Sequence, residues 1–175
     1  MFITFLLILV QAMSASTIYD FNKDTSTVGW RVVDDSVMGG LSQGKLKMDD
    51  NGNGVYSGSV SLANNGGFSS LRYQFTPINV SDSTTVVLRI KGDGKRYQFR
   101  VKDKTSQYHS YITYFETSGE WQTVRLPLRD FYPSFRGRKL RIPNFNHSQI
   151  AEVAFLIGNK KAESFELVID MIGLE

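Results

Sequence analysis

Residues 86–102 read VVLRIKGDGKRYQFRVK, a pattern that is typical of β-structure. The first five residues, 86–90, form a mainly aliphatic run, and the last seven alternate apolar with polar or charged side chains. Such alternation indicates a strand that buries one face and leaves the other in water. The Gly-Asp-Gly sequence at 92–94 provides the backbone freedom of a tight turn. We therefore predict a hairpin formed by strands at 86–90 and 97–101.

The same strand–turn–strand pattern continues along the rest of the chain. Residues 49–54 (DDNGNG) carry the Asn-Gly chemistry of a tight hairpin turn, and Pro77 is expected to end the strand before it. No segment offers a convincing amphipathic helix. About ten antiparallel strands with regular spacing predict an all-β sandwich. The expected strands cover residues 18–21, 30–33, 45–48, 55–62, 68–75, 86–90, 97–101, 108–115, 121–126, 153–157 and 165–174.

The 175 residues suffice for one domain with a full hydrophobic core and are too few for two ordinary domains. Residues 2–10 are almost entirely apolar and small residues follow, so residues 1–15 are predicted to be a signal peptide. The apolar run is too short to cross a bilayer, and no transmembrane span is expected in the mature domain, residues 16–175. The leader predicts an exported protein, periplasmic or envelope-associated. A mis-set start codon would instead leave the protein in the cytoplasm.

Composition and charge narrow the function classes. Cysteine is absent, which excludes a disulfide framework, a thiol nucleophile and a zinc–thiolate site. The formal net charge is only +3, but residues 125–141 contain six basic residues against one acid. Such a cluster suits an acidic partner, a membrane surface or nucleic acid, or is a solvated loop whose arginines pair with acids elsewhere. The six are Arg125, Arg129, Arg136, Arg138, Lys139 and Arg141.

Short motifs of catalytic and metal-binding proteins lack their context in this chain. Residues 40–44 (GLSQG) match a serine nucleophile elbow, which requires a turn from a strand into a helix, but a strand is expected next. Residues 49–54 match the first half of an EF-hand loop, but Val60 stands where the bidentate glutamate belongs. We therefore predict no enzymatic activity and no cofactor. Asp20 and Asp170 would meet if the terminal strands pair, where they either hold a structural calcium ion or are ordinary exposed aspartates.

Several segments, taken in order, resemble one protein family. They are residues 29–42 (GWRVVDDSVMGGLS), 65–72 (NGGFSSLR), 88–97 (LRIKGDGKRY), 121–128 (WQTVRLPL), 135–138 (FRGR) and 165–172 (FELVIDMI). Together they resemble the CIA30 domain, the complex I intermediate-associated protein 30 family, over nearly everything after the leader. The resemblance implies a galactose-binding-domain-like jelly-roll β-sandwich, a fold also seen in carbohydrate-binding modules. It also implies a role in assembly, because eukaryotic members assist assembly of NADH:ubiquinone oxidoreductase in mitochondria and related domains accompany photosystem assembly factors in chloroplasts.

Two loops that contain paired glycines form the candidate binding region. Gly39-Gly40 and Gly66-Gly67 permit positive φ and close backbone approach, so both loops are expected to be tight. Met38 and Phe68 are apolar tips beside them. These tips either contact a partner or plug the end of the sandwich.

Charged residues flank the same loops. Arg72 is expected to pair with Asp34 or Asp35, since a guanidinium matches a carboxylate in shape and charge. Alternatively, one of these carboxylates holds a loop by accepting backbone N–H bonds. The predicted partner-binding residues are Asp34, Asp35, Met38, Gly39, Gly40, Gly66, Gly67, Phe68, Arg72, Arg136 and Arg138.

The loops and the resemblance together predict a non-catalytic binding or assembly-factor module with a chaperone-like role. Its partner would be a protein client of an envelope or respiratory complex, and no nucleic acid is expected. A carbohydrate-binding module of the jelly-roll type is the alternative, because the chain is rich in tyrosine. Sugar recognition needs aromatic rings gathered on one exposed face, yet Tyr111 and Tyr114 fall on opposite faces of their strand.

Overall fold

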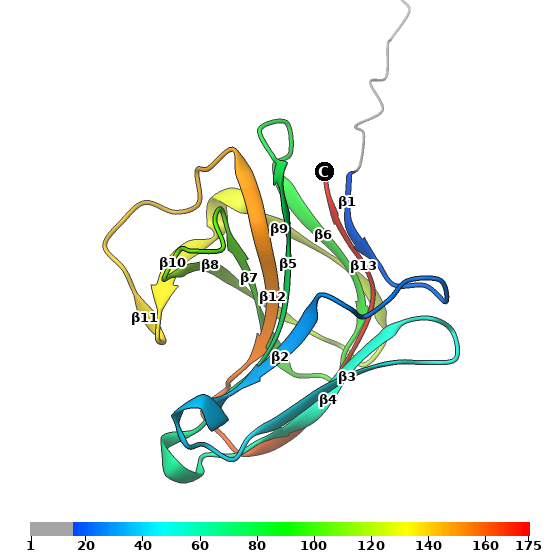
Figure 1. Ribbon diagram of the computed structural model, residues 1–175, viewed down its shortest axis with the longest axis vertical. Helices are drawn as coiled ribbons and strands as arrows, with labels where there is room; N and C mark the ends of the chain where they lie inside the picture. Colours follow the sequence, from blue (N-terminus) through cyan, green and yellow to red (C-terminus); the bar gives the residue numbers. More distant parts are fainter. Residues whose placement is uncertain (1–15) are drawn as a thin grey trace, which may run out of the picture.

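The computed structural model describes residues 16–175, which form two antiparallel sheets stacked face to face (Figure 1). The leader predicted over residues 1–15 lies outside the described residues, so export stays a prediction. One sheet has six strands in the order β3-β4-β13-β6-β9, with β1 paired to β13. Its strands are β1 (Ser16–Asp20), β3 (Gln43–Met48), β4 (Gly54–Val60), β6 (Thr85–Lys91), β9 (Trp121–Pro127) and β13 (Glu163–Leu174).

The second sheet has seven strands in the order β11-β10-β8-β7-β12-β5-β2. Between residues 16 and 175 no α-helix occurs, which confirms the all-β sandwich, and no helix there has the length and hydrophobicity that a membrane crossing requires. Three short 3-10 helices interrupt the strands: η1 (Asp35–Met38), η2 (Ala63–Asn65) and η3 (Leu128–Asp130). The strands are β2 (Trp30–Asp34), β5 (Ser69–Asn79), β7 (Arg96–Lys102), β8 (Ser110–Glu116), β10 (Tyr132–Phe135), β11 (Arg138–Lys139) and β12 (Gln149–Ile157).

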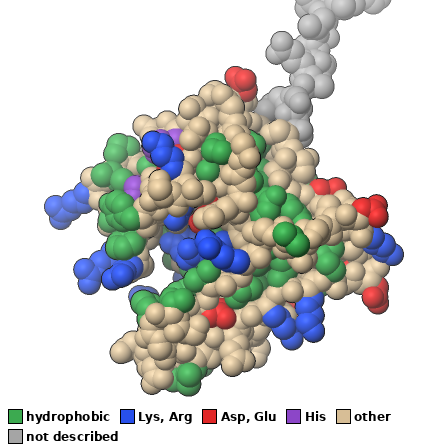
Figure 2. All heavy atoms as spheres, viewed as in Figure 1, with side chains coloured by type: hydrophobic (Ala, Val, Ile, Leu, Met, Phe, Trp, Pro, Cys, Tyr) green, Lys and Arg blue, Asp and Glu red, His purple; other side chains and the backbone are tan. Residues whose placement is uncertain are grey.

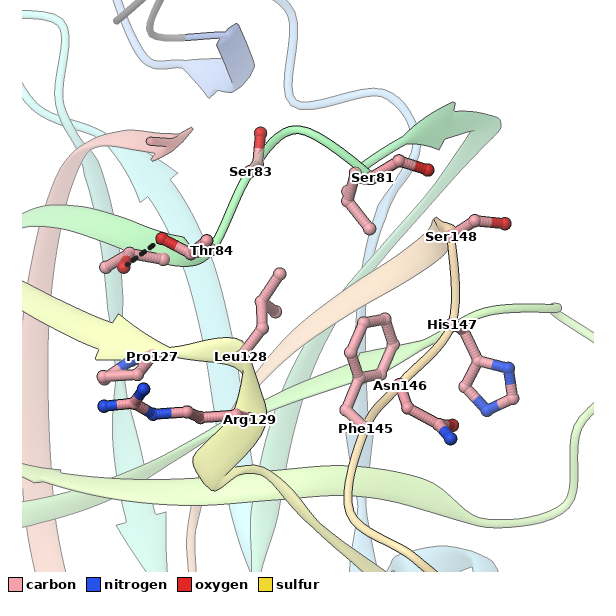
Figure 3. Close-up of a pocket in the computed structure, with 12 residues that line it drawn as sticks. Ser81, Ser83, Thr84, Pro127, Leu128, Arg129, Phe145, Asn146, His147 and Ser148 are labelled. Carbon is pink, nitrogen blue, oxygen red and sulfur yellow. Dashed lines mark hydrogen bonds between the residues drawn. The ribbon is translucent and has the colours of Figure 1, made fainter.

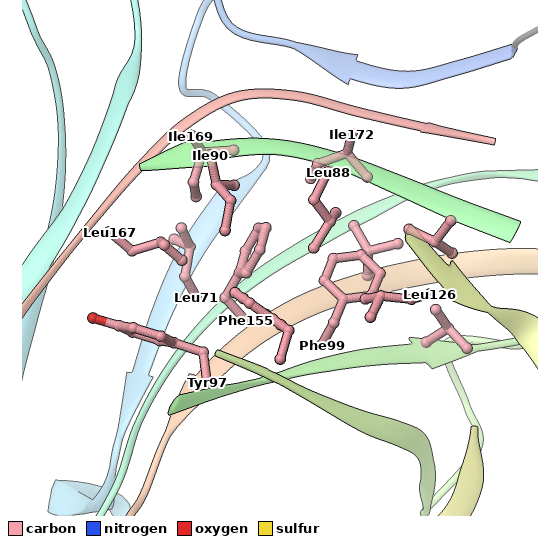
Figure 4. Packing of buried hydrophobic residues seen from close by; sticks show 14 of the residues in the cluster. Leu71, Leu88, Ile90, Tyr97, Phe99, Leu126, Phe155, Leu167, Ile169 and Ile172 are labelled. Carbon is pink, nitrogen blue, oxygen red and sulfur yellow. The ribbon is translucent and has the colours of Figure 1, made fainter. Parts of the chain in front are cut away.

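Side chains from both sheets meet in one hydrophobic core (Figure 4). The alternation of residues 97–101 serves this core, because every second residue of β7 is buried in it. Burying one such aliphatic or aromatic side chain contributes roughly 1.5–3 kcal/mol relative to leaving it exposed. The six-stranded sheet contributes Leu88, Ile90, Leu167, Ile169 and Ile172, and the seven-stranded sheet contributes Leu71, Tyr97, Phe99 and Phe155.

The hairpin predicted for residues 86–101 is wrong. β6 pairs with β9 and β13 in one sheet, whereas β7 pairs with β8 and β12 in the other. The Gly-Asp-Gly sequence therefore crosses from one layer to the next. Asp93 fastens the crossing, since its carboxylate accepts hydrogen bonds from the Tyr97 hydroxyl (2.9 Å) and the Glu166 backbone N–H (2.9 Å). The alternation of apolar and polar residues identifies the buried face of each strand, but it does not show which strand lies beside it.

Other strands depart from the prediction for local reasons. The turn at residues 49–54 does join β3 and β4. β10 and β11 are absent from the predicted set because their turn uses Arg136 and Gly137 at positive φ (48° and 75°), a geometry usually signalled by Asn-Gly or Asp-Gly. β5 continues through Pro77, because its pairing with β12 is interrupted there by a register shift and the missing N–H breaks no ladder bond.

A buried carboxylate ties three chain segments together at one end of the sandwich. Asp35 of η1 has no exposed surface, and it accepts hydrogen bonds from the backbone N–H groups of Ser42 (2.9 Å), Gly67 (2.6 Å) and Phe68 (3.2 Å). The Ser42 hydroxyl donates a fourth bond to it. Burial opposes ionisation of Asp35, but these hydrogen bonds outweigh it and hold the pKa of the carboxyl below its ordinary value.

Two glycines make room for this carboxylate. A Cβ at Gly40 would collide with Oδ1 of Asp35, and a Cβ at Gly66 would lie 2.6 Å from Oδ2. Both glycine pairs therefore pack around one buried charge. Because Asp35 fixes the two loops, it also fixes the apolar residues Met38 and Phe68 that the loops carry.

Asp35→Asn is expected to lower the free energy of unfolding by about 2–3 kcal/mol, because an amide nitrogen cannot accept the N–H and O–H bonds that a carboxylate oxygen takes. Urea titration followed by tryptophan fluorescence measures the loss. Asp50→Asn, in the exposed β3–β4 turn, is the matched control and should change stability by less than about 0.5 kcal/mol. A loss no larger than that of the control would contradict the structural role of Asp35.

Stability should also fall in acid. Because the folded-state pKa of Asp35 is lowered, its contribution is complete above the ordinary carboxyl value of 3.8 and is lost as the pH falls through the folded value. The same balance of burial against hydrogen bonds lowers the pKa of Asp49 and Asp93. Urea titrations between about pH 5 and 2 should show a steep loss for the wild type and a shallower one for Asp35→Asn. Parallel profiles would show that Asp35 does not contribute to the acid sensitivity.

Candidate functional site

A groove crosses the outer face of the seven-stranded sheet, the face turned away from the core. In Figure 1 the loops that follow β2 and β4 stand at one side of this curved sheet, and β10 and β11 stand at the other. The groove has a volume of about 700 Å³; its floor is formed by β5, β7, β8 and β12, one wall by residues 37–38 and 65–68, and the other by residues 132–137. Figure 2 shows Lys and Arg side chains gathered in this hollow between hydrophobic patches.

Strand register places three arginines in one row across the floor. Cross-strand partners project from the same face of a sheet, so a chain of partners defines a row. Ala154 lies between Arg72 and Arg100, and its single methyl group leaves space above the floor for both long side chains. The row runs Arg31 (β2), Arg72 (β5), Ala154 (β12), Arg100 (β7), Ile112 (β8) and Tyr132 (β10).

The guanidinium of Arg100 is held in the groove without a neutralising partner. Burial, and after it the positive charge of Arg72, lowers the pKa of Arg100 from 12.5 to about 10. Its Nε is buried and has no hydrogen-bond partner within residues 16–175. Over the same residues no carboxylate lies within 4 Å of the charged nitrogens of Arg72 or Arg100. At neutral pH Arg100 stays protonated, so the floor carries partly buried positive charge.

One acid lies beside the floor and is already engaged. Glu152 is buried, accepts a hydrogen bond from the Gln74 side-chain amide (2.6 Å), and lies 3.8 Å from Nζ of Lys102. Lys102 also donates to the backbone carbonyl of Gln107 (2.9 Å). Burial lowers the pKa of Lys102, and the charge of Glu152 works in the opposite direction. Glu152 therefore balances Lys102 and leaves the two arginines unneutralised.

Aromatic rings on the far wall and on the adjoining floor strand β8 each have a cation over one face. Each of three rings has a positive side chain over its face, an arrangement favoured by the negative charge density of the ring. The distances to the ring centroids are 4.5 Å for Arg96 over Tyr114, 5.1 Å for Lys139 over Tyr132 and 5.3 Å for Arg136 over Phe135.

Apolar side chains form the near wall. Val37 and Met38, at the tip of η1, are 72% and 60% exposed, and Phe68 is half-buried beside Gly67. Asp35 holds this wall by its hydrogen bonds to the loops, as described above. Exposed apolar groups next to a cationic floor form a surface for a partner that carries both apolar and anionic groups.

The predicted partner-binding residues fall into three groups. Asp34 and Asp35 lie beneath the near wall, where Asp34 accepts a hydrogen bond from the Gly44 backbone N–H (2.9 Å). Gly39 and Gly40 belong to the same loop, and Arg138 is exposed on β11 outside the lining of the groove. The residues that the structure brings together around the groove are Met38, Gly66, Gly67, Phe68, Arg72 and Arg136.

The expected ion pair between Arg72 and an aspartate is wrong. Arg72 projects from the outer face of β5, and its Nε donates a long hydrogen bond (3.4 Å) to the Ser70 hydroxyl. Asp35 accepts backbone N–H bonds from the loops instead, and Asp34 accepts one from Gly44 in strand β3. The alternative considered from the sequence, a carboxylate that holds a loop, describes Asp35.

Sequence reasoning missed the cations at the centre of the floor. Arg100 and Lys102 occupy the polar face of β7, which the alternation assigns to water. Arg31 and Tyr132 are also absent from the predicted site residues. The signal that could have identified these residues is their common row, and a row becomes visible only when the strand order is known.

A second cavity, of about 580 Å³, lies at the end of the sandwich between residues 80–85, 127–129 and 145–148. Figure 3 shows its two ionisable side chains, Arg129 and His147, pointing away from one another. His147 contacts Tyr111 (Nε2 to hydroxyl, 2.8 Å) and Asp103 (3.5 Å) instead. Because no charged groups converge on this space, the groove is the stronger candidate site.

The remaining residues of the motifs considered in the sequence have surroundings that are typical of structural residues. Ser42, the serine of the GLSQG motif, is 2% exposed, donates to Asp35 and accepts a hydrogen bond from the Ser61 N–H (3.0 Å). Asp20 and Asp170 lie on the paired strands β1 and β13, and burial together with the nearby Asp20 charge raises the pKa of Asp170. Among residues 16–175 no three His, Asp or Glu side chains cluster as metal ligands would.

Sequence comparisons match this chain to one family. Residues 19–169 match the family model described as Complex I intermediate-associated protein 30 (CIA30). The mitochondrial complex I intermediate-associated protein 30 of Mus musculus is 24% identical over 91% of this chain, and the chain spans 56% of the mouse protein. An uncharacterised protein of Schizosaccharomyces pombe is 28% identical over 82% of this chain and 76% of its own length.

Structural comparison agrees on the fold. The family 11 carbohydrate-binding module from Clostridium thermocellum, in complex with a β-1,3-1,4-mixed-linked tetrasaccharide, has a TM-score of 0.70 at 16% identity, covering 93% of this chain and 96% of the module. This likeness shows a jelly-roll β-sandwich. The family match extends from β1 into β13, and it includes both glycine loops around Asp35 and the floor of the groove. The chain therefore belongs to the complex I intermediate-associated protein 30 family.

Proposed function

We propose that this chain is a non-catalytic binding module that holds a segment of a client protein in the groove during assembly of a respiratory complex of the NADH:ubiquinone oxidoreductase type. The lining of the groove carries the proposal. Apolar side chains on one wall adjoin a cationic floor, and the part of the chain that the structure describes contributes no Asp, Glu or His to that lining. Those are the usual general acids and bases, so the lining favours holding over bond-breaking.

The walls suit an assembly factor in a second way. The near wall is fixed by a buried charge, so the groove is formed before a client arrives and little ordering is needed on binding. A client segment in the groove would cover its own apolar side chains against Val37, Met38 and Phe68. Covering such groups until a subunit reaches its place is what a chaperone-like module does. Family membership supports a protein as the client, since the family is named for its association with a complex I intermediate.

The neutral double variant Val37→Gln with Met38→Gln should weaken client capture by about tenfold or more, because it removes two exposed apolar contacts without changing the charge of the groove. A photo-crosslinking residue at position 108, which is 65% exposed in the groove, measures capture in intact cells. In cells that depend on the introduced protein, native gels measure the amount of assembled NADH:ubiquinone oxidoreductase.

Val28→Gln is the matched control, because Val28 is 84% exposed and lies outside the groove. It should leave crosslinking and assembly at the wild-type level. If the double variant also kept both at that level, the groove would not be the client site.

A second candidate function, carbohydrate binding, is favoured by the two tyrosines Tyr108 and Tyr114, which are exposed in the groove. Sugars stack on open ring faces, however, and Arg96 already covers a face of Tyr114. Sugar hydroxyls also need acceptors as well as donors, whereas the arginines and lysine of the floor offer donors only. These features favour the protein client.

Isothermal titration with a β-1,3-1,4-mixed-linked tetrasaccharide tests the second candidate. We expect no saturable binding up to about 1 mM, because Arg96 covers a face of Tyr114 and the cations of the floor are donors only. Micromolar binding that Tyr114→Ala abolishes would favour the carbohydrate-binding function instead. Tyr108→Ala provides the parallel test on the other exposed ring.

A further inference from the structure

The groove has an excess of one charge. Arg72, Arg100, Lys102 and Arg136 line it, and the described residues supply no carboxylate to the same lining. Glu152 lies nearby but is engaged by Lys102 and Gln74. The arginines of the floor are therefore left without an anionic partner from residues 16–175.

Arg100 is the informative member of this set. Its Nε is buried and unpaired, and Arg72, one strand removed from it across Ala154, carries the same charge. The Arg100 side chain is only partly buried, but a cationic nitrogen that is withdrawn from water without an acceptor costs stability, whereas an apolar group in its place would not. A cost of this kind at the bottom of a groove is consistent with a partner that arrives from outside.

The chemistry of that partner follows from the donors. Guanidinium and ammonium groups offer only N–H donors, so they complement a group that has only acceptors. A carboxylate is such a group, and its two oxygens match the parallel N–H bonds of one guanidinium. Two arginines in one row can receive two carboxylates, or hold one from both sides.

We propose that the groove selects an acidic segment of its client, with Arg100 and Arg72 receiving the carboxylates of that segment. This inference rests on the proposed function, because it names the chemistry of the segment that the groove holds. The apolar wall decides between a polypeptide and other anions. Val37, Met38 and Phe68 stand beside the cations, so the occupant presents apolar groups next to its charges, as an amphipathic acidic peptide does and inorganic phosphate does not.

The size of the groove fits a short extended segment. The row from Arg31 to Tyr132 crosses six strands. At the usual spacing between strands this is a distance of about 24 Å. An extended chain covers that distance with about seven residues.

Fluorescence anisotropy with two labelled nine-residue peptides tests the proposal. One peptide contains three leucines, three glutamates and three serines, and the other replaces each glutamate by glutamine. At about 50 mM salt, where screening is modest, the wild-type domain should bind the glutamate peptide at least about tenfold more tightly. Arg100→Gln should remove this preference, so that the affinity for the glutamate peptide falls to about that for the glutamine peptide.

Lys47→Gln is the matched control, since it removes one positive charge from an exposed position on the other sheet. It should leave the preference intact. Circular dichroism checks folding: Arg100→Gln should melt at or above the wild-type temperature, because it removes a partly buried charge whose Nε has no partner. Arg72→Gln, at a half-buried position of the same row, carries the test if Arg100→Gln does not fold.

Equal affinities for the two peptides, no binding of either, or a preference that survives both arginine substitutions would each overturn acid selection. Tighter binding of inorganic phosphate or of phosphatidylglycerol vesicles than of the glutamate peptide would also overturn it, because the occupant would then be a phosphate or a membrane surface. None of these results contradicts the proposal that the groove holds a protein client. That proposal depends on the crosslinks from position 108 and their loss in the neutral variant of the apolar wall.

Discussion

The buried carboxylate of Asp35 is the contact on which the candidate site depends. It accepts bonds from the residue that precedes β3 and from the loop that precedes β5, while it belongs to η1 itself. The two glycine pairs, distant in sequence, are one structural unit, because Gly40 and Gly66 both give up a side chain to admit the same carboxylate. This unit holds the apolar near wall of the groove in a fixed position. The glycine loops therefore position Met38 and Phe68 in the lining of the groove.

Two charged side chains of this protein, the fully buried Asp35 and the partly buried Arg100, have opposite surroundings. Asp35 is surrounded by four donors, and its negative charge is compensated within the fold. Arg100 has a buried nitrogen without an acceptor and a like charge as a neighbour. The first arrangement stabilises the sandwich, and the second leaves a cationic nitrogen on the floor of the groove without a partner from residues 16–175.

The sequence predicts the strands and their buried faces well, because the period-two alternation follows directly from burial. It does not predict neighbours: residues 86–102 have the alternation of a hairpin, yet β6 and β7 lie in different layers. The same lack of information on strand neighbours explains which site residues the sequence does not predict. The glycine loops were found because glycine pairs are visible in the sequence, whereas Arg31, Arg72 and Arg100 form a row only through the pairing of β2, β5, β12 and β7. The polar face of β7 was assigned to water because nothing in its own sequence shows that the walls of a groove rise around it.

The likeness to carbohydrate-binding modules concerns the shape of the sandwich, and the side chains on its concave face decide what that shape can hold. A groove for a neutral sugar needs open aromatic faces and a mixture of donors and acceptors. Here cations lie over Tyr114, Tyr132 and Phe135, and the charged residues of the floor are donors. Since the outer face of a sheet contributes little to the core, its residues can change without changing the fold. One jelly-roll shape can therefore carry different side chains on that face, and in this chain the row from Arg31 to Tyr132 places cations there.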